Sequence, residues 1–144
     1  MATKTTSKKA IIVAPARPKF QYAVKFICKS SIPGTSLEDK AFLPGHYQTI
    51  VNIHNPWTKP AKFRKKLAWA IEIGRYFPGE LKGDGVATIT CQQVTDFGLH
   101  LIHGFEGFLV IESDVSLDVT AVYMAGDKTV ASIDVSQIKE RRLR

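Results

Sequence analysis

The chain has 144 residues, which is the length of a single domain and enough to form a hydrophobic core without disulfides or metals. Apolar residues make up 44% of it and charged residues 23%, which is ordinary for a globular protein. Its net charge of +7 is carried by the two ends: residues 1–19 contribute +5 and residues 139–144 contribute +3, which leaves −1 for residues 20–138. No run of about 18 apolar residues occurs, so the sequence gives no sign of a membrane-spanning helix.

The first 19 residues are predicted to form a basic, flexible arm, because they are rich in Thr, Lys, Ala and Pro and show no sustained pattern. The β-prone triplet Ile11, Ile12 and Val13 interrupts this arm. We interpret the triplet as an assembly arm that pairs with an edge strand of its own body or of a neighbouring subunit. The apolar run around it ends at Pro15 and is shorter than the roughly 7–15 residues of a signal peptide, so we expect a cytoplasmic protein.

From residue 20 onward, apolar and polar residues alternate with the period of a half-buried strand. Residues 20–28 form the first such run and residues 47–53 the second. A long loop is expected over residues 33–45, because a Pro-Gly pair lies at each of its ends. Residues 61–73 keep apolar side chains mainly on one parity and charged ones on the other. This third run predicts one long strand, with a helix as the main alternative.

The second half of the chain is predicted to contain a loop, a short helix and four short strands. Residues 75–85 are expected to be loop, because Pro-Gly and Gly-Asp-Gly occur in them. Residues 92–101 are expected to form the helix, with Val94 and Phe97 on its buried side. The four strands are expected at residues 86–91, 105–111, 117–123 and 129–135. Seven strands joined by turns predict an all-β domain over residues 20–138, built as an antiparallel two-sheet β-sandwich, with a jelly roll or barrel as the alternative. Residues 139–144 are expected to form a basic C-terminal tail.

The sequence shows no catalytic signature. It lacks the nucleophile elbow, the P-loop and the dinucleotide-binding motif. His100 and His103 have helical spacing but no supporting set of ligands, so we expect no metal and no other cofactor. Glu112 is assigned to a solvated acidic turn. Cys28 and Cys91 lie in apolar runs and are expected to be buried thiols, with one disulfide between them left open as the alternative. We therefore expect a protein that is not an enzyme.

A basic row offers a nucleic-acid-binding alternative. Lys62, Arg64 and Lys66 share one parity, with Lys65 beside them, and alternate residues of a strand project at about 7 Å spacing, close to that of successive phosphates. Trp57 lies nearby and could stack on a base. The competing interpretation is a charged outer face that keeps an exposed strand soluble.

A weaker candidate is a ligand-binding loop region that contains Trp57, Tyr76 and Phe77, which could hold a small molecule or a glycan. Nothing in the sequence selects such a ligand. The leading interpretation is therefore a non-enzymatic protein that acts through protein–protein contacts, as a homo-oligomer, a structural subunit or a soluble signalling adaptor.

Three segments resemble the sensory rhodopsin transducer family and its small uncharacterised bacterial relatives. They are residues 45–56 (GHYQTIVNIHNP), residues 107–123 (GFLVIESDVSLDVTAVY) and residues 132–139 (SIDVSQIK), and the resemblance extends over residues 20–138. It implies a small self-assembling β-sandwich that serves as an interaction partner without catalysis. It transfers Asn52, Asn55 and Asp118 only as positions that frame strands and turns.

Overall fold

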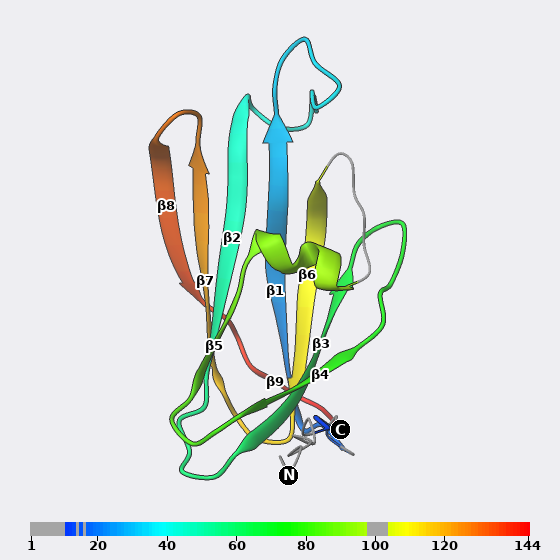
Figure 1. Ribbon diagram of the computed structural model, residues 1–144, viewed down its shortest axis with the longest axis vertical. Coiled ribbons are helices and arrows are strands. Elements are labelled where there is room, and N and C mark those ends of the chain that lie inside the picture. Colours follow the sequence, from blue (N-terminus) through cyan, green and yellow to red (C-terminus); the bar gives the residue numbers. More distant parts are fainter. Residues whose placement is uncertain (1–10, 14, 16, 98–103) are drawn as a thin grey trace, which may run out of the picture.

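The computed structural model describes residues 11–13, 15, 17–97 and 104–144, so His100 and His103 lie outside the described residues. The described part is built of antiparallel strands and one short 3-10 helix (Figure 1). This confirms the all-β prediction. The elements are β1 (Phe20–Ser31), β2 (Gly45–His54), β3 (Ala61–Ala68), β4 (Phe77–Leu81), β5 (Val86–Ile89), η1 (Cys91–Phe97), β6 (Phe105–Ser113), β7 (Asp118–Gly126), β8 (Val130–Gln137) and β9 (Arg141–Arg142). No described helix is long and apolar enough to cross a membrane.

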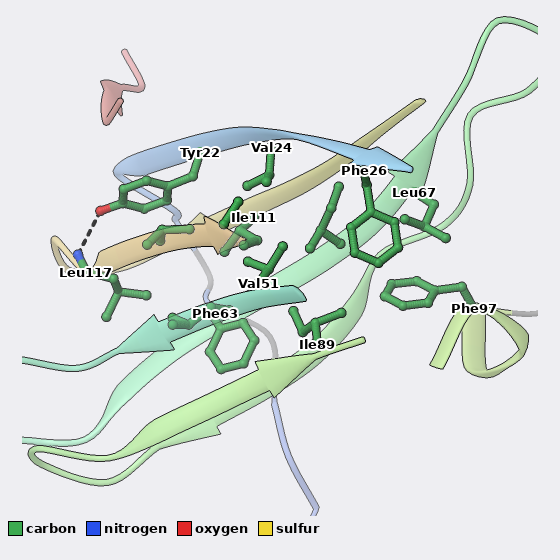
Figure 2. Packing of buried hydrophobic residues seen from close by; sticks show 14 of the residues in the cluster. Tyr22, Val24, Phe26, Val51, Phe63, Leu67, Ile89, Phe97, Ile111 and Leu117 are labelled. Carbon is green, nitrogen blue, oxygen red and sulfur yellow. Dashed lines mark hydrogen bonds between the residues drawn. The ribbon is translucent and has the colours of Figure 1, made fainter. Parts of the chain in front are cut away.

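The described strands are hydrogen-bonded into one sheet in the order β4-β3-β6-β1-β2-β7-β8, with β5 added to β2 and β9 added to β1. β1 and β2 pair only from Cys28 opposite Gln48 to Ser31 opposite Gly45. Beyond that point β5 takes the same edge of β2, along residues 51–54. One edge of β2 thus pairs with β1 near the start of β2 and with β5 near its end. β1 and β5 separate from each other beyond the β1–β2 pairing, and core side chains of both strands lie between them (Figure 2).

The core confirms the strand period predicted for residues 20–28. Tyr22, Val24 and Phe26 project from one side of β1 and are 1%, 0% and 0% exposed. Figure 2 shows these side chains pointing toward the space that they share with Val51 and Ile111. The strand alternates because one face packs into this core while the other stays partly in water.

Cys28 and Cys91 form a disulfide, with 5.5 Å between their Cα atoms. The expectation of two buried thiols is therefore wrong, and the alternative that the sequence left open is the one that forms. The bond links positions 63 apart in the sequence and joins β1 to the first residue of η1.

The strand predicted over residues 61–73 ends at Ala68. The backbones of Trp69 and Glu72 exchange two hydrogen bonds, of 3.0 and 3.2 Å, and the chain reverses between them. Ile71 and Ile73, predicted to continue the apolar face, are consequently 90% and 71% exposed. The alternating pattern continues through this turn, so the period alone placed the end of the strand too late.

The loop predicted over residues 75–85 contains a strand, β4, which includes Pro78 and Gly79. β4 lies at the end of the strand order, where a proline is tolerated because its missing N–H faces no partner. Gly79 is needed there, since a Cβ at this position would lie 2.3 Å from the Phe63 ring. Pro78 and Gly79, which usually indicate a loop, therefore belong to an edge strand that packs closely on the Phe63 ring.

The C-terminal residues are not a loose tail. β9 pairs with the start of β1, and the Leu143 N–H donates to the Lys19 carbonyl at 2.8 Å. The buried Tyr22 hydroxyl donates to Glu140 at 2.6 Å and accepts from the Leu117 N–H at 2.7 Å. Burial, followed by the hydrogen bond to Glu140, raises the pKa of Tyr22 to about 12. These contacts fix residues 140–143 to the body.

The N-terminal triplet Ile11, Ile12 and Val13 lies outside any strand, and all three side chains are exposed. The pairing of this segment with its own sheet, one of the two arrangements considered for it, is therefore not formed. Pro15, two residues further on, is buried.

Candidate functional site

The predicted basic row is partly neutralised by a buried carboxylate. Arg64 donates to Glu112 Oε2 through Nε at 2.8 Å and Nη2 at 2.5 Å. Tyr76 donates to the other oxygen at 2.8 Å, and Gln21 donates to it at 3.1 Å. Burial alone would raise the pKa of Glu112, but the hydrogen bonds from Tyr76, Arg64 and Gln21 outweigh it and hold this pKa below the ordinary value of 4.5. The solvated turn predicted for Glu112 is wrong, because β6 continues through Ser113.

The lysines of the row lie in different surroundings. Lys62 and Lys66 lie on the same side of β3 as Arg64, and the Lys66 ammonium lies 4.4 Å from the centre of the Tyr76 ring. Lys65 has the opposite parity and lies 5.6 Å from the Phe97 ring, where burial lowers its pKa. The four residues therefore do not form one row of free cations.

The three residues proposed as a ligand-binding loop contact different parts of the molecule. Trp57 donates from Nε1 to the Ser116 carbonyl at 2.7 Å. Tyr76 lies against the basic row and Glu112. Phe77 belongs to β4 and packs edge-on against Phe97, with 5.5 Å between ring centres. These contacts provide no common binding surface.

His54 bridges three segments of the chain. His54, at the end of β2, contacts Asp118 at 2.8 Å through Nδ1 and Asp84 at 2.7 Å through Nε2. Asp84 lies in the turn between β4 and β5 with a φ of 58°, and Asp118 begins β7. The hydrogen bond to the Asp84 carboxylate, followed by that to the Asp118 carboxylate, raises the pKa of His54 above its ordinary value of 6.5. In the described part of the chain no group of three ligating side chains is placed to hold a metal ion. The contacts of His54 connect β2 to the turn before β5 and to the start of β7.

The segment that stands out as a contact surface is the wing, which we define as residues 122–137: the second half of β7, the following turn and β8. β8 pairs with β7 and ends the strand order, so its other edge has no described partner (Figure 1). Its apolar residues Val130, Ile133 and Val135 are 58%, 61% and 65% exposed. An edge strand with exposed apolar residues is a template for pairing with another chain.

The outer face of the wing is apolar across neighbouring strands. Ile133 lies opposite Met124 of β7, and Val135 lies opposite Val122. Val122 in turn lies opposite Ile50 of β2. A contiguous apolar patch of this kind marks an interaction surface more often than a surface left in water.

The inner face of the wing is polar and borders a small hollow of about 110 Å³. Tyr123 of β7 lies opposite Asp134 of β8 there. Burial, followed by the nearby Asp134 carboxylate, raises the pKa of Tyr123. The two faces of β8 therefore differ: Ile133 and Val135 share the outer one, and Ser132 and Asp134 share the inner one.

The sequence predicts a strand at residues 129–135, close to β8, but does not mark it as a contact surface. Residues 131–136 alternate as a half-buried strand does, and this pattern does not say whether the apolar face is covered. A signal was present, since residues 130–137 contain one charged residue and neither lysine nor proline, the usual protections of an edge. That signal has meaning only once the strand order is known.

Comparison with known proteins shows the fold and nothing of the activity. No family model matches the sequence, and no curated protein matches it. The crystal structure of Thermotoga maritima 1070 is similar, with a TM-score of 0.59 and 9% identity, over 87% of this chain and 96% of that chain. At that identity the likeness is one of fold alone. The resemblance to the sensory rhodopsin transducer family stays a prediction.

Proposed function

We propose that this protein is a non-enzymatic assembly subunit that associates through its wing. The observation that carries the proposal is the exposure of Val130, Ile133 and Val135 on a strand whose outer edge has no described partner. Association removes this apolar surface from water, at about 25 cal/mol per Å² of buried area, and pairs the free backbone groups of the edge. The absence of a recognisable catalytic motif in the sequence agrees with this role. A soluble signalling adaptor, which the transducer resemblance implies, would use the same surface.

The test is the molar mass in solution, measured by light scattering after size exclusion at tens of micromolar. We expect a mass above the 16.0 kDa of one chain for the unaltered protein. The double variant Ile133→Ser with Val135→Thr should return the mass to 16.0 kDa, because it removes apolar surface and keeps the strand. Ile71→Ser is the matched control: Ile71 is 90% exposed in the turn between β3 and β4, so the mass should not change. An unaltered protein that stays monomeric at tens of micromolar contradicts the proposal.

The assembly arm predicted at Ile11, Ile12 and Val13 is a second route to association. Deleting residues 1–19 separates it from the wing. If the arm joins the subunits, the mass falls on deletion and is insensitive to the wing variant. If the wing joins the subunits, the mass falls in the wing variant and is insensitive to the deletion.

Nucleic-acid binding is the second candidate function. It is supported by Lys62 and Lys66 on one side of β3 and by the exposed Arg141 and Arg142 of β9. It is weakened by Arg64, whose charge is already paired with Glu112. If it occurs, affinity should fall steeply with salt, and Lys62→Glu with Lys66→Glu should flatten that dependence. Binding that the double variant leaves unchanged would exclude the face of β3.

The disulfide bears on where the protein works. Disulfides persist in oxidising compartments and are rare in the cytosol. The Cys28–Cys91 bond therefore favours an oxidising compartment over the cytoplasmic location expected from the sequence. Thiol labelling of the protein in lysate from its native cells, quenched with acid, distinguishes the two: full protection of both cysteines supports the oxidising compartment, and labelling supports the cytoplasm.

A further inference from the structure

We infer that η1 is a cover over one end of the core, that the Cys28–Cys91 disulfide holds it in place, and that reduction of this bond releases it. η1 lies outside the wing, so this redox-sensitive device is separate from the proposed association. Three observations lead to it: the attachments of η1 to the body, the surface that it covers and the access of a reductant to the bond.

η1 has few attachments to the body. It is a 3-10 helix of 7 residues, and Phe97 is the buried residue in it. The hydrogen-bond geometry of 3-10 helices is poor, so they occur as short pieces that depend on their surroundings. Among the described residues, residues 92–97 hydrogen-bond only within η1 and with Thr90. The disulfide at one end and the Phe97 side chain at the other are therefore the main anchors of η1.

η1 covers apolar surface at one end of the core. The Phe97 ring packs against the Phe77 ring with 5.5 Å between their centres, and Val94 packs partly against the core. Figure 2 shows the Phe97 ring reaching from η1 toward the part of the core that holds Phe26 and Leu67. Release of η1 therefore exposes the Phe97 ring and the apolar side chains beneath it to water.

The strands on both sides of the bond have other partners in the sheet. Cys28 belongs to β1, which pairs with β6 along residues 20–28. η1 follows β5, which pairs with β2 along residues 86–89. Reduction removes no hydrogen bond from either pair, so we expect the sheet to persist while η1 loses one of its two anchors.

The bond is open to a reducing dithiol. Cys28 and Cys91 are both partly exposed, so a small dithiol can approach them. One thiolate of the dithiol attacks a sulfur of the bond and releases the other cysteine, and the second thiolate then displaces the cysteine that was attacked. The cysteines take up two electrons and two protons to become thiols, and the dithiol becomes a disulfide. A reducing dithiol is thus the one co-reactant that the release requires.

Limited proteolysis with chymotrypsin tests the release, because this protease cleaves after aromatic residues in segments that open locally. The protein is reduced with dithiothreitol, alkylated and freed of reagents before the protease is added. Phe97 is 6% exposed, and cleavage after it should be about ten-fold faster in reduced than in oxidised protein. Trp57, 51% exposed between β2 and β3, is the internal reference, and cleavage after it should keep its rate. Cys28→Ser with Cys91→Ser should be cleaved after Phe97 at the fast rate whether or not it is reduced first.

Amide hydrogen exchange of the reduced, alkylated protein keeps the test decisive if the serine variant does not fold. Exchange along residues 91–97 should rise about ten-fold on reduction, while that of β1 stays the same. Unchanged exchange in η1, with unchanged cleavage after Phe97, would show that the bond does not hold the cover. An equal rise in β1, or equally faster cleavage after Trp57, would show that reduction opens the whole body and overturns the inference. A bond that resists dithiothreitol in the folded protein overturns it as well.

Discussion

β1 and β8 carry the same alternation of apolar and polar residues, yet they end in opposite environments. On β1, Tyr22, Val24 and Phe26 are almost completely buried, whereas Ile133 and Val135 on β8 are more than half exposed. β1 has β6 on one side, β2 and β9 on the other, and the core against its inner face. β8 has β7 alone. Alternation therefore determines which residues share a face, and the neighbours of the strand determine whether that face is covered.

The largest effect on the free energy of unfolding is expected from the Cys28–Cys91 disulfide, which links β1 to η1. Replacing Cys28 and Cys91 by serine frees a loop of 63 residues in the unfolded chain, which lowers the free energy of unfolding by about 4 kcal/mol on a chain-entropy basis. Urea unfolding with and without reductant measures it, the serine variant serving as the control that no longer responds to reductant. A change below about 1 kcal/mol would mean that the bond adds little to the body.

The core of β1 comes next. Phe26→Ala removes a fully buried ring and should lower the free energy of unfolding by about 3–4 kcal/mol. Ile133→Ala, on the exposed strand, should change it by less than about 0.5 kcal/mol in protein diluted until it is monomeric. Equal losses from the two variants would show that β8 is covered within one chain.

The buried carboxylate of the body gives a smaller effect. Glu112→Ala leaves Arg64 and the Tyr76 hydroxyl without their acceptor and should cost about 2 kcal/mol, since Arg64 is partly exposed. The pKa of Glu112 is depressed in the folded state, so its contribution is present above pH 4.5 and is lost as the pH falls through the folded value. Acid unfolding curves of Glu112→Gln should lack this loss. An unchanged acid transition in the variant contradicts the role assigned to the carboxylate.

The smallest effect is expected at the edge of the body, where His54 is shared between Asp84 and Asp118. Its pKa is raised, so the stabilisation is present below pH 6.5 and is lost as the pH rises through the folded value. NMR titration of the imidazole should give a pKa above 6.5, and Asp118→Asn should lower it. A pKa of His54 that is the same in Asp118→Asn as in the unaltered protein would show that the bridge is not formed.

The sequence predicted the strands of the body well where one face is buried, as along residues 20–28 and 47–53. The end of β3 was predicted too late, because Ile71 and Ile73 continue the alternation of apolar and polar residues through a turn. It missed β4, because Pro78 and Gly79 mark loops more often than edge strands. The disulfide, the Glu112 network and the exposed face of the wing depend on which distant segments become neighbours, and a single sequence does not contain that information.

Amide hydrogen exchange of β8, followed as the protein is concentrated, tests most directly whether the wing is the contact surface. We predict that exchange along β8 slows markedly from micromolar to near-millimolar protein, while that of β1 stays the same at both concentrations. Exchange in β8 that is as fast in concentrated as in dilute protein, in a sample that nevertheless associates, would place the contact elsewhere on the molecule.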